Sequence, residues 1–280
     1  METFLDAALH QTFLQNALIG GLLASIACGI VGSFVVVKRI GYIAGGIAHA
    51  VLGGMGIAYY FGYSPIGGAI VAALLSAGII GWINLHWQQQ EDTIISALWS
   101  VGMATGVLFI ARTPGYNVDL MSYLFGNILM IPRQDLYLIF VLDLAIALVI
   151  LLFYKQFLAV AFDEEFARLR GVRVDLFYLL LLALVSLTVV ILIQVVGLIM
   201  VIALLTLPAA IAGHFVHSLA KMMVLATLFG AFFTTGGLFI SYQPDLPAGA
   251  TTVLLAGLGY LLSSLFASLR HRIRRPIASR

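Results

Sequence analysis

The chain has 280 residues, of which 62% are hydrophobic and only 9% are charged, and its formal net charge is +2. This little polar surface cannot cover a soluble globule of that length, so the composition excludes a protein whose main solvent is water. Nucleic-acid binding needs a concentrated basic face, which only the basic tail at 270–280 offers. We therefore predict an all-α, polytopic integral membrane helix bundle that forms one domain over residues 1–280.

A helix needs about 20 mostly apolar residues to cross the hydrocarbon layer. In chain order we expect spans near 13–36, 41–61, 66–86, 93–111, 136–154, 176–195, 197–216, 222–240 and 250–269. This count is nine, with eight as the alternative if the junction at Gly197 does not separate two full spans.

Basic residues gather on one side of these spans. Clusters follow the first, fifth, seventh and last spans at Lys38, Arg39, Lys155, Arg168, Arg170, Arg173, Lys221, Arg270, Arg272, Arg274, Arg275 and Arg280. Even numbers of crossings separate the clusters, and only Arg112 and Arg133 fall on the other side. The positive-inside tendency then predicts an external N-terminus and a cytoplasmic C-terminus.

The second predicted span contains a histidine among glycines. Residues 41, 45, 49 and 53 recur every four positions, so His49 lies on a helix face otherwise made of glycine. Ionisable groups deep in a membrane are expensive and indicate function, and neutral imidazole binds first-row divalent metals well. A hydrogen bond to a carbonyl of a neighbouring helix is the structural alternative.

Asp143 is the single carboxylate that we place well inside a span. It either pairs with His49, lines a transport path, or makes a simple hydrogen bond between helices. His214 and His217 are three residues apart near the inner end of the seventh predicted span. They have the spacing of metal ligands, although such a pair at a helix end usually faces the lipid headgroups.

Two stretches between the spans differ from ordinary loops. The segment 119–135 is apolar but too short to cross, so we expect an outer interfacial or re-entrant helix that stops near Pro132. On the cytoplasmic side, 160–172 is predicted to form an amphipathic helix with one apolar stripe, acids early, bases late and a stop at Gly171. It is either a solvated helix on the headgroups or a docking element; its three acids suit a protein partner better than an anionic leaflet.

Enzyme motifs are missing from the chain. None of its three lysines has a glycine before it, which excludes a phosphate-binding loop, and no His-Glu-x-x-His, Cys-x-x-Cys or Gly-x-Ser-x-Gly pattern occurs. Cys28 is the sole cysteine, so an internal disulfide is excluded. We predict a transporter that is not itself an enzyme.

Several stretches resemble one family, the permease subunits of ATP-binding-cassette uptake systems for zinc, manganese and iron, and most closely the zinc-uptake permeases. They are 38–50, 119–126, 163–171, 197–210 and 241–249. The resemblance implies a homodimer in the bacterial inner membrane, cytoplasmic ATPase subunits, an external metal-binding protein and a transported ion in place of a bound cofactor. It also implies a coupling helix that contacts the ATPase through Asp163, Glu164, Glu165, Phe166, Ala167, Arg168 and Gly171.

One departure from the family pattern concerns the metal. The position four residues before His49, usually an aspartate in this family, is Gly45 here. Either His49 of both protomers holds the ion, or an acid such as Asp143 or Asp119 substitutes, or the pathway binds only weakly. Manganese prefers carboxylates more than zinc does, so we expect zinc, with manganese or iron as the alternatives.

Two other classes of function remain open at this point. A secondary carrier or channel would move ions along a gradient through His49 and Asp143, and it would work without ATPase subunits. A membrane scaffold without transport would tolerate replacement of both residues.

Overall fold

The computed structural model describes residues 4–86, 91–113, 124, 126 and 128–274. These residues form helices and turns without a strand, which confirms the all-α prediction. The helices are α1 (Phe4–His10), α2 (Thr12–Lys38), α3 (Gly41–Tyr60), α4 (Pro65–His86), α5 (Glu91–Ala111), the 3₁₀ turn η2 (Ile128–Met130), α7 (Arg133–Leu152), α8 (Tyr154–Phe162), α9 (Glu164–Leu169), α10 (Val174–Val196), α11 (Val201–Phe215), α12 (Leu219–Tyr242) and α13 (Ala248–Arg274).

Eight of the described helices are long and apolar enough to cross a membrane: α2, α3, α4, α5, α7, α10, α12 and α13. The seventh predicted span, 197–216, is the exception, because α11 has only 15 residues. At 1.5 Å per residue such a helix is about 22 Å long, short of the ~30 Å hydrocarbon core. The alternative count of eight is therefore the correct one for full-length spans.

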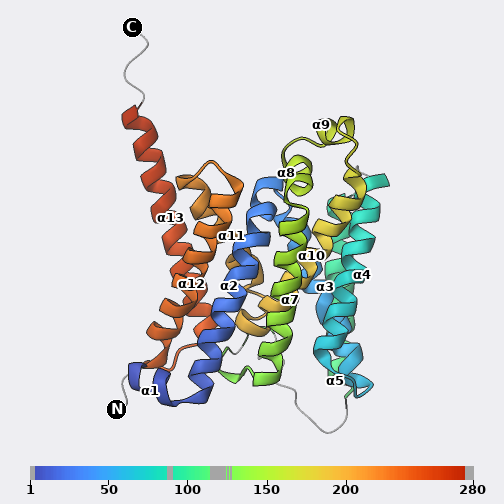
Figure 1. The fold of residues 1–280 in the computed structure, drawn as a ribbon. Helices are drawn as coiled ribbons and strands as arrows, with labels where there is room; N and C mark the ends of the chain where they lie inside the picture. Colours follow the sequence, from blue (N-terminus) through green and yellow to red (C-terminus); the bar gives the residue numbers. More distant parts are fainter. Residues whose placement is uncertain (1–3, 87–90, 114–123, 125, 127, 275–280) are drawn as a thin grey trace.

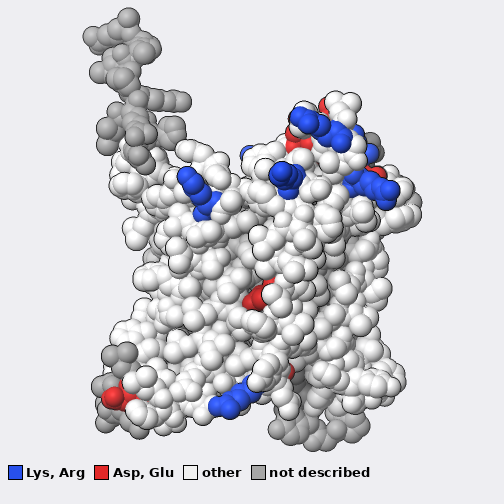
Figure 2. Space-filling model, in the orientation of Figure 1, with Lys and Arg blue, Asp and Glu red and all other residues white. Residues whose placement is uncertain are grey.

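The predicted sidedness survives this correction. α11 still returns the chain to the end of the bundle where α9 lies, so α12 starts there as well (Figure 1). Lys and Arg side chains gather at that same end, and few lie at the opposite one (Figure 2). By the positive-inside rule the α9 end is cytoplasmic, and α1 lies outside.

The helices pack around two central ones. α10 contacts α2, α3 and α4, while α2 contacts α7, α11 and α12; α5 packs on α3, and α13 packs on α11 and α12 (Figure 1). In α2 and in α10, 67% of the residues in an apolar stretch of 18 residues are buried. The corresponding share is 11% in α5 and 17% in α13. The outward apolar faces of α5 and α13 fit contact with lipid.

The chain breaks its helical path between α10 and α11, inside the bundle. Gly197 has φ 82° and ψ 163°, and Val196 and Leu198 on either side of it are each 1% exposed. In an apolar environment the backbone groups freed by such a break need partners. The Ile199 N–H donates to the carbonyl of Leu124 at 3.1 Å, and the Met200 N–H donates to the carbonyl of Gly197 at 3.3 Å.

The outer segment supplies one side of this break. Gly126 has φ +70°, and a Cβ there would collide with the backbone of Val196 and Gly197. Of the predicted outer helix, residues 119–123, 125 and 127 lie outside the described residues. The described part contains the short turn η2, followed by Pro132 as the N-cap of α7; the outer helix itself stays a prediction.

We expect Gly126→Ala to destabilise the protein by about 2 kcal/mol or more, because the methyl group meets backbone and the left-handed conformation is strained for alanine. Thermal unfolding of the purified permease in detergent would measure the loss. Gly78→Ala in α4 is the matched control, since nothing lies within 4 Å of a Cβ at that position. An equal melting temperature for both variants would contradict this account of the break.

Candidate functional site

The site around His49 begins with the contact between α3 and α5. A Cβ on Gly53 would lie 2.9 Å from the carbonyl oxygen of Gly102, and one on Gly56 would lie 2.6 Å from that of Gly106. The two backbones therefore touch without side chains between them, as the glycine stripe predicted.

Trp99 of α5 covers the imidazole of His49. The two ring centroids are 4.0 Å apart and the planes differ by 10°, so the rings are stacked. His49 is 9% exposed, and its Nδ1 atom has no hydrogen-bond partner among the described residues. The structural alternative, a hydrogen bond from Nδ1 to a neighbouring helix, is thus not formed there.

Tyr42 closes the cytoplasmic side of this aromatic group. Its hydroxyl lies 2.6 Å from the hydroxyl of Ser96 on α5, and its ring centroid is 6.5 Å from that of Trp99. Ser96 and Trp99 were not singled out in the sequence, although they share the three-residue spacing that continues to Gly102 on one face of α5.

The first turn of α11 lies against Gly45. A Cβ at that position would be 2.6 Å from Cδ1 of Ile202 and 3.7 Å from Cζ3 of Trp99. A carboxylate at residue 45 would therefore need Ile202 to move. α11 can approach α3 this closely because residue 45 is a glycine and not an acid.

Asp143 is a buried carboxylate on α7, only 4% exposed, and neither of its oxygens has a hydrogen-bond partner among the described residues. The suggested pair with His49 is consequently not formed. Asp143 interacts electrostatically with the buried Cys28 on α2, a helix that packs against α7.

The described residues bring no three His, Cys, Asp or Glu side chains together as a metal centre. His214 bonds through Nδ1 to the hydroxyl of Ser263 at 3.1 Å and stacks on Tyr260. The spacing of His214 and His217 does not translate into a shared site, because each is exposed and no described contact joins them.

The predicted cytoplasmic helix at 160–172 is divided in two. Asp163 is extended, with φ −153° and ψ 100°, and it separates α8 from α9. Its carboxylate accepts a hydrogen bond from the N–H of Phe166 at 2.9 Å, which makes it the N-cap of α9. A single continuous helix was the wrong expectation, because an aspartate side chain that accepts from the N–H three residues later favours a helix start over a helix interior.

The short helix α9 is held to the end of α2. Lys38 Nζ forms an ion pair with Glu164 and donates to the carbonyl of Val160 at 3.0 Å. Gly171, with φ +78°, ends the segment as expected. The apolar residues stay uncovered: Phe162 is 64% exposed, Phe166 48% and Leu169 88%, while Ala167 is fully buried.

Comparison with known proteins places the chain in a family. The sequence profile of the ABC 3 transport family matches residues 10–267. The chain is 42% identical to a probable metal transport system membrane protein of Chlamydia pneumoniae, over 94% of this chain and 90% of that protein. It is 34% identical to the manganese transport system membrane protein MntC of Halalkalibacterium halodurans, over 94% and 90%.

A solved structure agrees with these relatives. PsaBC from Streptococcus pneumoniae, determined in complex with a Fab, superimposes with a TM-score of 0.85 at 36% identity, and the match covers 93% of this chain and 94% of that one. The similarity therefore extends over nearly the whole of both chains. The chain therefore belongs to the ABC 3 transport family, of which it is a multi-pass membrane permease.

Proposed function

We propose that this permease carries a divalent transition metal ion into the bacterial cytoplasm as part of an ATP-binding-cassette importer. The names of its relatives, a probable metal transport protein and a manganese transport protein, support this cargo. ATP hydrolysis is assigned to separate cytoplasmic subunits, in keeping with a sequence that has no phosphate-binding loop. An external metal-binding protein delivers the ion, and two copies of the permease form the pathway.

The observation that carries this proposal is the state of His49. A buried imidazole with an unbonded Nδ1 is a ready ligand for a first-row metal, and its cost inside a membrane argues for a function. Trp99 restricts the orientation of the ring by stacking on it. In a homodimer, a second His49 would provide a second imidazole to the same ion.

Asp143 is proposed as a further group of the pathway. Its carboxylate is buried and has no hydrogen-bond partner among the described residues. Burying an unpaired charge costs free energy unless a cation or a proton binds to it. Since the pair with His49 is not formed, the two residues would act at separate points and not as one binding site.

Manganese is the cargo that the relatives favour, and zinc is the second candidate. Zinc is favoured by one specific observation: Gly45 leaves the region near His49 without the carboxylate that manganese prefers. Only a comparison of the metals separates the two, because first-row ions differ modestly in their ligand preferences.

The surface formed by α9 and the last residue of α8 is proposed as the contact with the ATPase. Phe162, Phe166 and Leu169 are exposed apolar side chains on the cytoplasmic side, beyond the membrane-spanning helices. Asp163, Glu164, Glu165 and Arg168 surround them with charge, and Asp163 and Glu164 also hold α9 in place. Such an apolar centre with a charged rim is typical of a protein interface.

We expect His49→Ala to lower metal-stimulated ATP hydrolysis roughly tenfold or more, because the ion loses a ligand in the membrane. The assay uses nanodiscs that contain the permease with its ATPase and metal-binding subunits, and it compares manganese, zinc and iron. His10→Ala, an exposed histidine of α1, is the control. Unchanged stimulation in His49→Ala would remove His49 from the pathway, and metal uptake by the permease without ATPase subunits would favour a secondary carrier.

We expect Gly45→Asp alone to impair transport, since its side chain meets Ile202. Combined with Ile202→Ala, it should raise the stimulation by manganese relative to zinc severalfold, because a carboxylate then lies one turn from His49. Gly45→Asn with Ile202→Ala has the same shape without the charge. The same metal ratio in both double variants would show that the carboxylate does not select the ion.

We expect Leu169→Ser to weaken coupling, so that metal stimulates ATP hydrolysis less. The melting temperature should not change, because Leu169 is 88% exposed and supports no packing within the chain. Leu269→Ser, at an exposed leucine of α13, is the matched control. Full stimulation in Leu169→Ser would argue against α9 as the coupling helix.

A further inference from the structure

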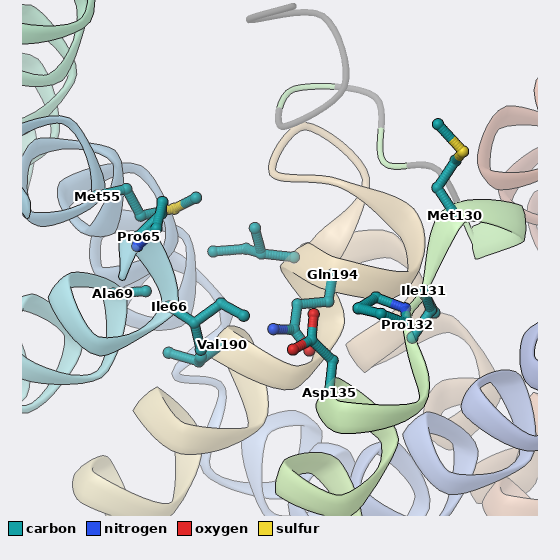
Figure 3. Close-up of a pocket in the computed structure, with 11 residues that line it drawn as sticks. Met55, Pro65, Ile66, Ala69, Met130, Ile131, Pro132, Asp135, Val190 and Gln194 are labelled. Atoms are coloured by element: carbon teal, nitrogen blue, oxygen red, sulfur yellow. The ribbon is translucent and has the colours of Figure 1, made fainter. Parts of the chain in front are cut away.

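A cavity of about 270 Å³ opens on the outer side of the bundle, away from α9. It lies among the outer ends of α3, α4, α7 and α10, with the chain after η2 as one wall (Figure 3). Most of its lining is apolar. Among the described lining residues, Asp135 of α7 and Gln194 of α10 have polar side chains, and the polar ends of these two point toward one another (Figure 3).

The amide of Gln194 has no hydrogen-bond partner among the described residues, either for its nitrogen or for its oxygen, and both atoms are buried. Leaving a buried polar group unpaired costs roughly 1–3 kcal/mol, and such groups in native proteins call for an explanation, an ion or a water among them. The carboxylate of Asp135 is the group that faces it.

Asp135 itself is half-buried. Neither of the two ion pairs among the described residues involves it. It sits in the first turn of α7, where the helix dipole favours a negative charge. An anionic carboxylate and an amide oxygen that converge on one space attract a cation.

We infer that Asp135 and Gln194 form an outer binding site for a partly hydrated divalent cation. Carboxylate, amide carbonyl and water are the ligands that manganese and other hard dications prefer. The space far exceeds the roughly 10–15 Å³ that a water needs, so water completes the coordination. Met55, another lining residue, is on the same helix as His49, roughly 9 Å further out along α3.

This site rests on the proposed function in one respect: its cargo is the ion that the permease imports. It would hold the ion on the outer side before His49 is reached. The helix of His49 has no carboxylate ligand at Gly45. Asp135 and Gln194 provide oxygen ligands from α7 and α10 instead, at a different position in the bundle.

The test measures Mn²⁺ binding to the permease–ATPase complex in phosphatidylcholine nanodiscs, through the loss of the electron paramagnetic resonance signal of free Mn²⁺. The starting protein is His49→Ala, so that binding at His49 does not contribute. We expect one Mn²⁺ per permease chain, at least tenfold weaker binding after a further Asp135→Asn or Gln194→Leu, and partial recovery with Asp135→Glu.

Asp245→Asn in the same background is the control. Asp245 is an acid between α12 and α13, outside the cavity, and its φ of 54° is tolerated by asparagine. Variants are compared only if their melting temperatures match. Equal Mn²⁺ binding with and without Asp135 and Gln194 would overturn the site.

The two proposals fail differently. If Asp135-dependent binding is found but no metal stimulates ATP hydrolysis by the unsubstituted complex, the cation site stands and the importer proposal falls. If metal stimulates hydrolysis but binding is independent of Asp135 and Gln194, the importer stands and the outer site falls.

Discussion

The need to pair every backbone polar group inside an apolar bundle governs the centre of this protein. The chain stops being helical at Gly197, where the neighbouring residues are almost fully buried. A break there is tolerated only because Leu124 and Gly126, more than seventy positions earlier in the sequence, approach the open backbone. Leu124 and Gly126 thus help to stabilise the interior of the bundle.

This break also determines the surroundings of His49. Because α11 begins inside the bundle, its first turn reaches the face of α3 and brings Ile202 against Gly45. On the other side, Trp99 stacks on the imidazole. Trp99 of α5 thus covers the imidazole, and Ile202 of α11 limits the size of residue 45, one turn away.

The sequence predicted the helical class from the length of its apolar stretches, the sidedness from the placement of basic residues, and the contact face of α3 from the spacing of glycines. Each of these patterns can be read from neighbouring residues or from counts along the chain. It could not predict the length of α11, since residues 197–216 are apolar throughout and the break depends on a distant segment. Trp99, Asp135 and Gln194 were likewise missed. Each gains its significance from a side chain on another helix, and a single sequence carries no record of that pairing.

The glycine contacts between α3 and α5 have a mechanical consequence. At Gly53 and Gly102, and again at Gly56 and Gly106, backbone lies on backbone. Such a seam has no side chains that could change rotamer and let one helix slide past the other. The backbone contact therefore holds His49 and Trp99 in register with each other, and the neighbour of α3 that meets it through a side chain is α11, at Ile202.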